Sequence, residues 1–95
     1  MKALVIDDEP LARAEMRRLL RAHPDIEIVG EAGDADQARD AIKRTAPDLL
    51  FLDVQMPEET GFDLLVSLTG RVPPVIFSTA FDEHAVRAFE FGALD

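Results

Sequence analysis

The chain has 95 residues, with 19 acidic side chains against 10 lysines and arginines, and it contains no cysteine. This length bounds the chain to one domain with one core, and the lack of cysteine excludes disulfides and thiolate metal sites. The net charge of −9 argues against nucleic-acid binding by the chain itself, because phosphate contacts come from clustered basic side chains. No apolar run approaches the ~20 residues that a membrane-spanning helix needs. We therefore expect a cytoplasmic protein with no membrane contact.

The first predicted elements are a strand, a helix and a second strand. Residues 3–6 form a continuous apolar run, which is typical of a strand buried on both faces. Pro10 suits the first turn of a helix that runs to about Ala22. The basic side chains of this helix predict a solvated face made of Arg13, Arg17, Arg18 and Arg21. Residues 26–32 alternate more between apolar and polar, so this strand is expected nearer a sheet edge.

The same alternation continues in the second half of the chain. Asp34 and Gln37 resemble a capping box at the start of a second helix, which Pro47 closes. Residues 48–53 form the second strongly apolar strand, which again ends on an acid. A loop, a short helix, a fourth strand and a last helix follow, over residues 54–60, 61–68, 75–79 and about 83–91. This pattern predicts an α/β fold with a parallel sheet and helices on both faces.

Polar side chains that suit phosphoryl chemistry stand at the ends of three predicted strands. Asp7 and Asp8 follow the first strand, Asp53 ends the third, and Thr79 ends the fourth. In a doubly wound, flavodoxin-like sheet of order 2-1-3-4, strands one and three are neighbours, so the three carboxylates would meet at one edge. Carboxylates this close raise one another's pKa or need a cation between them, and a site of oxygen ligands favours a hard cation such as Mg²⁺. Asp53 could then accept a phosphoryl group, and Thr79 could hydrogen-bond one of its oxygens.

A combination of short segments extends this pattern through the chain: residues 5–10 with both acids, residues 47–57 around Asp53, Gly61, residues 78–80, and residues 92–93. In this combination the sequence resembles the receiver domain of two-component response regulators. The resemblance implies that a partner histidine kinase, or a small phosphodonor, phosphorylates Asp53. It also implies that Asp8 and Asp53 ligate Mg²⁺ directly, that Asp7 acts through water, and that the backbone carbonyl of Gln55 is the third protein ligand. Thr79 matches the switch hydroxyl that turns toward the phosphoryl group.

The resemblance implies a signalling domain and not a conventional enzyme, although the pocket would catalyse its own phosphoryl transfer and hydrolysis. The family pattern continues past Asp95 with a fifth strand, which carries a lysine, and a fifth helix, so we expect residues 1–95 to be an incomplete receiver domain. Neither Lys2 nor Lys43 lies in the segment of that lysine. We therefore expect the chain to bind Mg²⁺ better than it signals.

Residues 77–95 are similar to receivers that precede a LytTR-type DNA-binding domain, which implies a C-terminal effector outside this chain. Without a fifth strand, the fourth strand would be an open edge with unpaired backbone groups. Such an edge predicts a homodimer, or an exchange of elements between two copies.

Two other functions remain open from the sequence alone. A Mg²⁺-dependent phosphohydrolase also uses a strand-end aspartate, but it needs a second acid two residues later, where this chain has Gln55. The chain could also be an interaction fragment that does not signal. Taken singly, Asp8 would more often cap a helix and Thr79 would be an ordinary strand residue. Only their combination with the other acids predicts a functional site.

Overall fold

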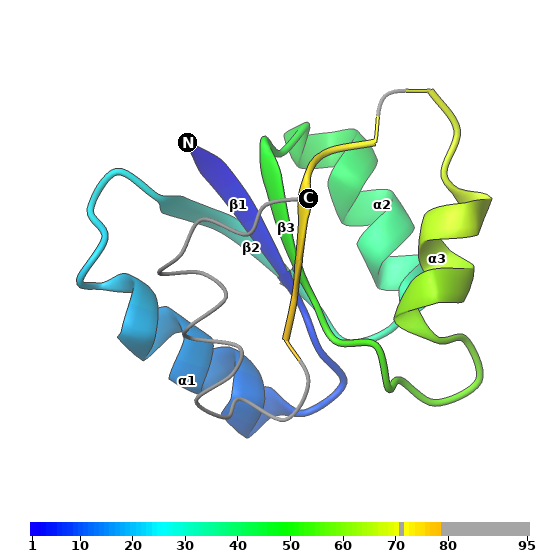
Figure 1. Ribbon diagram of the computed structural model, residues 1–95, viewed down its shortest axis with the longest axis horizontal. Coiled ribbons are helices and arrows are strands. Elements are labelled where there is room, and N and C mark those ends of the chain that lie inside the picture. The colour runs from blue at the N-terminus through cyan, green and yellow to red at the C-terminus, as the bar shows by residue number, and fades with distance from the viewer. Residues whose placement is uncertain (71, 79–95) are drawn as a thin grey trace.

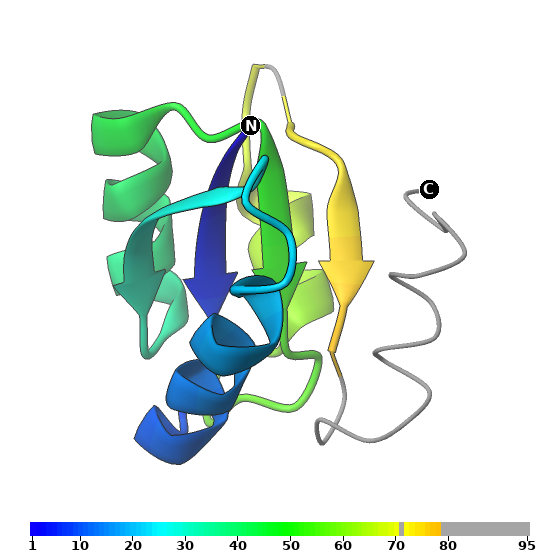
Figure 2. The same ribbon diagram turned by 90° about the vertical axis from the view of Figure 1, so that its left-hand side faces the viewer.

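The computed structural model describes residues 1–70 and 72–78. Within these ranges, parallel strands form one sheet in the order β2-β1-β3-β4, with α1 on one face and α2 and α3 on the other (Figures 1 and 2). The elements are, in chain order, β1 (Lys2–Ile6), α1 (Pro10–Leu20), β2 (Glu27–Ala32), α2 (Ala35–Thr45), β3 (Leu49–Leu52), α3 (Gly61–Ser67) and β4 (Val75–Phe77). The predicted doubly wound α/β fold and its strand order are confirmed.

The two faces of the central strands pack into separate cores. Leu4 and Ile6 of β1 join the core beneath α2 and α3, whereas Ala3 and Val5 join the core beneath α1. Each of these four side chains is at most 1% exposed. Successive strand residues point to opposite faces, so an unbroken apolar run is needed to fill both cores. The edge strand β2 is only half-buried over most of its length, as its alternating pattern predicted.

The first helix ends two residues before the predicted position. The N–H groups of Arg21, Ala22 and His23 each donate to the carbonyl three residues earlier, so the chain tightens into a turn after Leu20. Tight turns of this kind are common at helix ends. Pro24 gives the physical reason, because its ring disfavours helical conformation at the residue before it.

The ends of β3 and β4 also differ from the predicted bounds, but hydrogen bonds to the neighbouring strand continue past them. The N–H of Asp53 donates to the carbonyl of Ile6 at 2.9 Å, and the N–H of Ser78 donates to the carbonyl of Leu52 at 2.9 Å. The backbone of Asp53 is therefore still held by the sheet. Thr79 and the helix predicted over residues 83–91 lie outside the described residues.

Side-chain caps fix the starts of α2 and α3. Asp34 accepts from the N–H of Gln37 at 2.7 Å, as predicted, but the Gln37 side chain accepts from Gly33 at 2.8 Å and not from Asp34. A complete capping box, which the sequence analysis missed, opens α3. The Thr60 hydroxyl accepts from the N–H of Asp63 at 3.1 Å, and the Asp63 carboxylate accepts from the N–H of Thr60 at 3.0 Å. This box determines where the loop after β3 ends.

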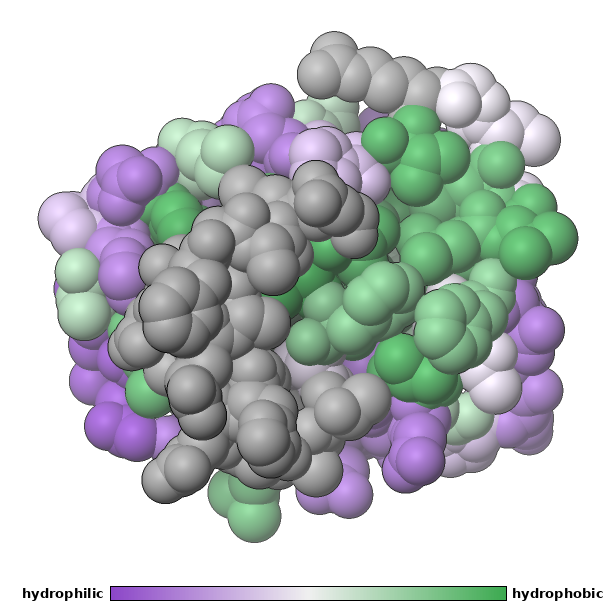
Figure 3. Space-filling model, viewed as in Figure 1, coloured by the Kyte–Doolittle hydropathy of each residue, from purple (hydrophilic) through white to green (hydrophobic). Residues whose placement is uncertain are grey.

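Apolar side chains gather on the surface over α3 and β4 (Figure 3). Phe62 and Val66 of α3 are exposed, and the ring centroid of Phe62 lies 5.3 Å from that of Phe77 in β4. Among the described residues, β4 pairs only with β3. The predicted association through β4 stays a prediction. No helix in the described part of the chain has the length and apolar character needed to cross a bilayer.

A pair of leucines tests which contacts hold this fold. Leu4 is fully buried in β1, whereas Leu11 is 83% exposed on α1. We expect Leu4→Ala to lower the free energy of unfolding by about 2–5 kcal/mol, because it leaves a cavity in the core. Leu11→Ala is the matched control, and we expect a change within about 0.5 kcal/mol. Urea denaturation measures both, and equal effects would contradict the described packing.

Candidate metal centre

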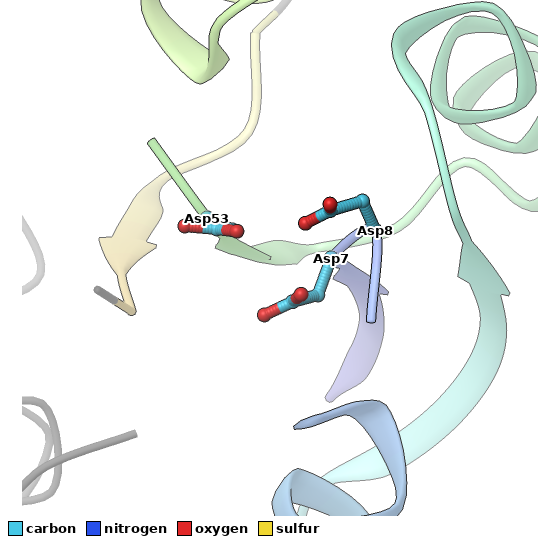
Figure 4. A group of neighbouring side chains, drawn as sticks. All are labelled: Asp7, Asp8 and Asp53. Atoms are coloured by element: carbon cyan, nitrogen blue, oxygen red, sulfur yellow. The ribbon is translucent and has the colours of Figure 1, made fainter. Parts of the chain in front are cut away.

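Three carboxylates stand together at one edge of the sheet. Asp7 and Asp8 follow β1 and Asp53 follows β3, and in these parallel neighbours Ile6 pairs with Leu52. The acids therefore leave the sheet at the same level, and Figure 4 shows the carboxylates of Asp7 and Asp8 on the side facing Asp53. One oxygen from each carboxylate lies within 4.8 Å of the other two. The structure thus brings together the three acids that the sequence analysis singled out.

Asp7 is almost fully buried, with 3% of its surface exposed. Burial raises the pKa of its carboxyl from 3.8 to about 6, because the charged form loses hydration. The N–H of Glu9 donates to Asp7 Oδ1 at 2.9 Å and opposes this rise, whereas the nearby charges of Asp53 and Asp8 add to it. In the absence of a cation, a negative charge on Asp7 is therefore unfavourable.

Asp53 lies in a similar environment on the neighbouring strand, and 8% of its surface is exposed. Burial raises the pKa of Asp53 above its ordinary value, and the adjacent Asp8 carboxylate adds to the rise. The N–H of Gln55 donates to Asp53 Oδ1 at 3.0 Å and lowers the pKa in part. This bond also orients the Asp53 carboxylate and places the backbone of Gln55 beside it.

The cluster fits a hard divalent cation. Every donor in it is an oxygen, and two of the three carboxylates are buried. The ligands of an octahedral Mg²⁺ ion, with bonds of about 2.1 Å, lie roughly 3–4.2 Å apart, and the carboxylate oxygens here lie within 4.8 Å of one another. A cation here would offset the burial and the mutual repulsion that raise the pKa values of Asp7 and Asp53. The side chains of Asp7, Asp8 and Asp53 are therefore its candidate ligands.

Arg13 of α1 holds the loop that carries Asp7. Its Nη1 donates to the backbone carbonyl of Asp7 at 2.6 Å, and its Nε donates to Glu31 of β2 at 3.0 Å. Arg17 pairs with the same Glu31 carboxylate. Because the Arg13 side chain is only 19% exposed, the prediction of a solvated arginine face is wrong at this position. Helical spacing cannot show this contact, since both partners of Arg13 come from other elements.

Gly61 allows α3 to begin directly against the backbone of Asp53. Its N–H donates to the carbonyl of Val54 at 2.9 Å. A Cβ on Gly61 would lie 2.6 Å from the carbonyl oxygen of Asp53 and 3.1 Å from the Leu52 side chain. Only glycine can approach this closely without moving the strand end. The sequence analysis named Gly61 without a role, because the contact depends on how α3 packs.

Residues 3–95 match the family of response regulator receiver domains. The chain belongs to this family. It is 48% identical over 96 residues to the transcriptional regulatory protein BtsR of Salmonella typhi and 46% identical over 96 residues to BtsR of Escherichia coli K12. It is also 42% identical over 97 residues to the sensory transduction protein LytT of Enterococcus faecalis. Each alignment covers 100% of this chain, which spans about 40% of the length of each relative.

Solved receiver structures share the fold. The response regulatory domain of protein mrkE from Klebsiella pneumoniae superposes with a TM-score of 0.72 at 35% identity, covering 97% of this chain and 77% of that one. The response regulator domain of Thermotoga maritima CheB gives a TM-score of 0.77 at 25% identity, covering 100% of this chain and 75% of that one. The resemblance to receiver domains drawn from the sequence is therefore confirmed.

In this receiver domain the two lysines lie away from the acids. The Lys2 ammonium donates to the carbonyl of Thr45 at 3.1 Å, at the edge of the sheet where β1 begins and opposite to Asp7. Lys43 is exposed in the last turn of α2. Thr79, the predicted switch hydroxyl, lies outside the described residues.

The raised pKa of Asp7 predicts a pH-dependent stability for the metal-free receiver. The folded state keeps a proton that the unfolded state loses between pH 3.8 and about 6, so stability falls as pH rises through this window and then levels off. Asp7→Asn removes the charge but keeps an oxygen for the Glu9 N–H. At pH 7.5 with a chelator, we expect this variant to be about 1–3 kcal/mol more stable than the wild type.

Urea denaturation at several pH values tests this expectation. The difference between Asp7→Asn and the wild type should shrink as the pH falls from about 6 and vanish below pH 3.8, where the wild-type carboxyl is protonated in both states. A variant that is less stable than the wild type at pH 7.5 would contradict the described burial of the charge.

The close approach of Gly61 predicts that Gly61→Ala is destabilising. Helix propensity alone would favour alanine by up to ~1 kcal/mol, but the added methyl group must displace the backbone of Asp53. We expect a net loss of about 1–3 kcal/mol in urea denaturation. Gly33→Ala is the matched control, because its Cβ would meet only side-chain atoms at 3.4 Å. A Gly61→Ala protein as stable as the Gly33→Ala protein would disprove the steric argument.

Proposed function

We propose that this receiver domain accepts a phosphoryl group on Asp53 in a Mg²⁺-dependent reaction. The observation that carries the proposal is the group of three carboxylates at the ends of β1 and β3, two of them buried, in a member of the receiver family. Asp8, Asp53 and the backbone carbonyl of Gln55 would ligate the cation, with Asp7 acting through water. When bound, Mg²⁺ would neutralise charge on the transferring phosphoryl oxygens.

The chemistry assigned to Asp53 is nucleophilic attack on phosphorus. A carboxylate oxygen of Asp53 forms the new P–O bond while the P–N bond of a kinase phosphohistidine breaks, and the leaving imidazole nitrogen keeps the electron pair. The N–H of Gln55 holds the carboxylate orientation through Oδ1. Thr79, which follows β4 by two residues in the sequence, would then donate its hydroxyl to a phosphoryl oxygen. Hydrolysis of the acyl phosphate by water would release inorganic phosphate and return the domain to its initial state.

The partners proposed for the chain follow from the relatives. A histidine kinase would supply the phosphoryl group, as the receiver resemblance implies. Two relatives are named as transcriptional regulators and a third as a sensory transduction protein. We therefore propose that phosphorylation of Asp53 is relayed through Thr79 and the surface of β4 and the following predicted helix to a C-terminal effector of the DNA-binding, LytTR type. The cytoplasmic location and the homodimer through β4 stay predictions, and none of these names favours the phosphohydrolase alternative.

Intact-mass spectrometry tests the proposed acceptor. The chain is incubated with a small acyl phosphate, with either Mg²⁺ or a chelator, and the number of phosphoryl groups added is measured. We expect one base-labile adduct that requires Mg²⁺ and is absent from Asp53→Asn. Asp40→Asn is the matched control, since Asp40 is exposed on α2 and pairs only with Arg44 among the described residues. An adduct of unchanged mass and yield in Asp53→Asn would overturn the assignment.

A further inference from the structure

Arg39 joins three parts of the chain on the side of the sheet covered by α2 and α3. Its guanidinium donates to both carboxylate oxygens of Glu59, with Nη1–Oε2 at 2.7 Å and Nη2–Oε1 at 2.9 Å. It also donates to Asp36, one turn earlier on α2, at 2.6 Å, and to the Ser67 hydroxyl of α3 at 3.0 Å. The Arg39 side chain is 27% exposed. One arginine thus ties α2 to the loop after β3 and to the end of α3.

The ion pair between Arg39 and Glu59 differs from those within the helices. Arg44 and Asp40 pair one turn apart on α2, with about two thirds of each side chain exposed, and such surface pairs contribute little. The pair of Arg39 and Glu59 spans 20 residues and is bidentate. A bidentate pair restricts the direction of both side chains as well as their distance. The hydrogen bonds from Arg39 also lower the pKa of Glu59, which favours its ionised form.

The loop over residues 54–60 contains one strained residue. Glu58 has a φ of 68°, a left-handed conformation that costs a residue with a side chain roughly 1–2 kcal/mol. The loop is held at its start by the buried side chain of Met56 and by the bond from Gly61 to Val54. The last part of the loop is held to α2 through Glu59. Without this contact, the strain at Glu58 would favour another loop conformation.

The same loop carries the backbone that adjoins the acceptor. Gln55 comes two residues after Asp53, and its N–H orients the Asp53 carboxylate. Gln55 is itself exposed, so its own side chain does not anchor it in the core. A change in the path of residues 54–60 would therefore move the Gln55 backbone relative to Asp53.

We propose that Arg39 is a positioning residue for the metal site: by clamping Glu59, it holds the loop so that the Gln55 backbone stays beside Asp53. The inference rests on the proposed Mg²⁺ site. Arg39 itself touches none of the candidate ligands among the contacts described above. Its effect on cation binding would pass through the loop alone.

The charge of Arg39 makes this proposal sharply testable. Removing a positive charge from the protein should by itself favour a cation, by Coulomb's law. Loss of the clamp should instead weaken binding, because the Gln55 backbone is no longer held beside Asp53. The two effects have opposite signs, so weaker binding in an Arg39 variant cannot come from the change in net charge.

Isothermal titration calorimetry of Mg²⁺ at pH 7.5 compares Arg39→Met with Arg44→Met, which removes the same charge from the same helix. We expect Arg39→Met to bind Mg²⁺ about 3- to 10-fold more weakly than the wild type, somewhat below the usual effect of residues that directly support a metal ligand. Arg44→Met should bind as tightly as the wild type or slightly more tightly. The double variant with Arg39→Met and Glu59→Gln keeps the net charge of the wild type but lacks the contact, so it should still bind Mg²⁺ more weakly than the wild type.

A second readout separates positioning from stability. Amide NMR of the metal-free protein should show shifts over residues 54–60 in Arg39→Met but not at Asp7 and Asp8. Arg39→Lys, which keeps the charge and a single bond, serves if Arg39→Met does not fold, and its affinity should be intermediate. Equal Mg²⁺ affinities in folded Arg39 and Arg44 variants would overturn the positioning role. A wild type that binds no Mg²⁺ would instead overturn the proposed function.

Discussion

Asp7 and Asp53 hold their carboxylates nearly out of solvent at the ends of neighbouring strands, and the organisation of the site depends on this placement. Charged groups in such positions are unfavourable unless they are paired or bound to a metal. The pairing of β1 with β3 determines this placement of the two carboxylates. Because Ile6 and Leu52 are fully buried and paired in register, the residue after each must leave the sheet at the same level. The core therefore gathers carboxyl groups whose pKa values are raised, and a bound divalent cation would lower these pKa values again.

Groups outside the cluster support it from both sides. Arg13 reaches from α1 to the carbonyl of Asp7, and Arg39 reaches from α2 to Glu59 in the loop after β3. Gly61 lets α3 pack directly against the strand end at Asp53. None of these residues is a candidate ligand, yet together they restrict both loops that carry the ligands. Functional groups in general need supporting residues of this kind to keep their geometry.

The sequence and the structure agree best where hydrophobic pattern and helix-start chemistry decide the outcome. The apolar run over residues 3–6 predicted a strand buried on both faces, and β1 is such a strand. Asp34 caps α2 as predicted, because this bond joins residues three apart in the chain. The end of α1 was less predictable, since it depends on where the hydrogen bonds of the α-helix are replaced by those of the turn before Pro24. The box of Thr60 and Asp63 was equally local, and its pattern could have been found from the sequence.

The sequence by itself determined the α/β class, the order of the strands and the three acids of the site, because these follow from apolar periodicity and from the handedness of strand connections. Only the tertiary structure decided what surrounds those acids. The contacts of Arg13 with Asp7 and of Arg39 with Glu59 join residues from different elements, and one of these arginines belonged to a set that the sequence analysis assigned to solvent. Burial, and with it the raised pKa of Asp7, likewise depends on packing. The sequence specifies which groups are present and which element carries each one. Packing specifies which groups come into contact and how far each is exposed to solvent.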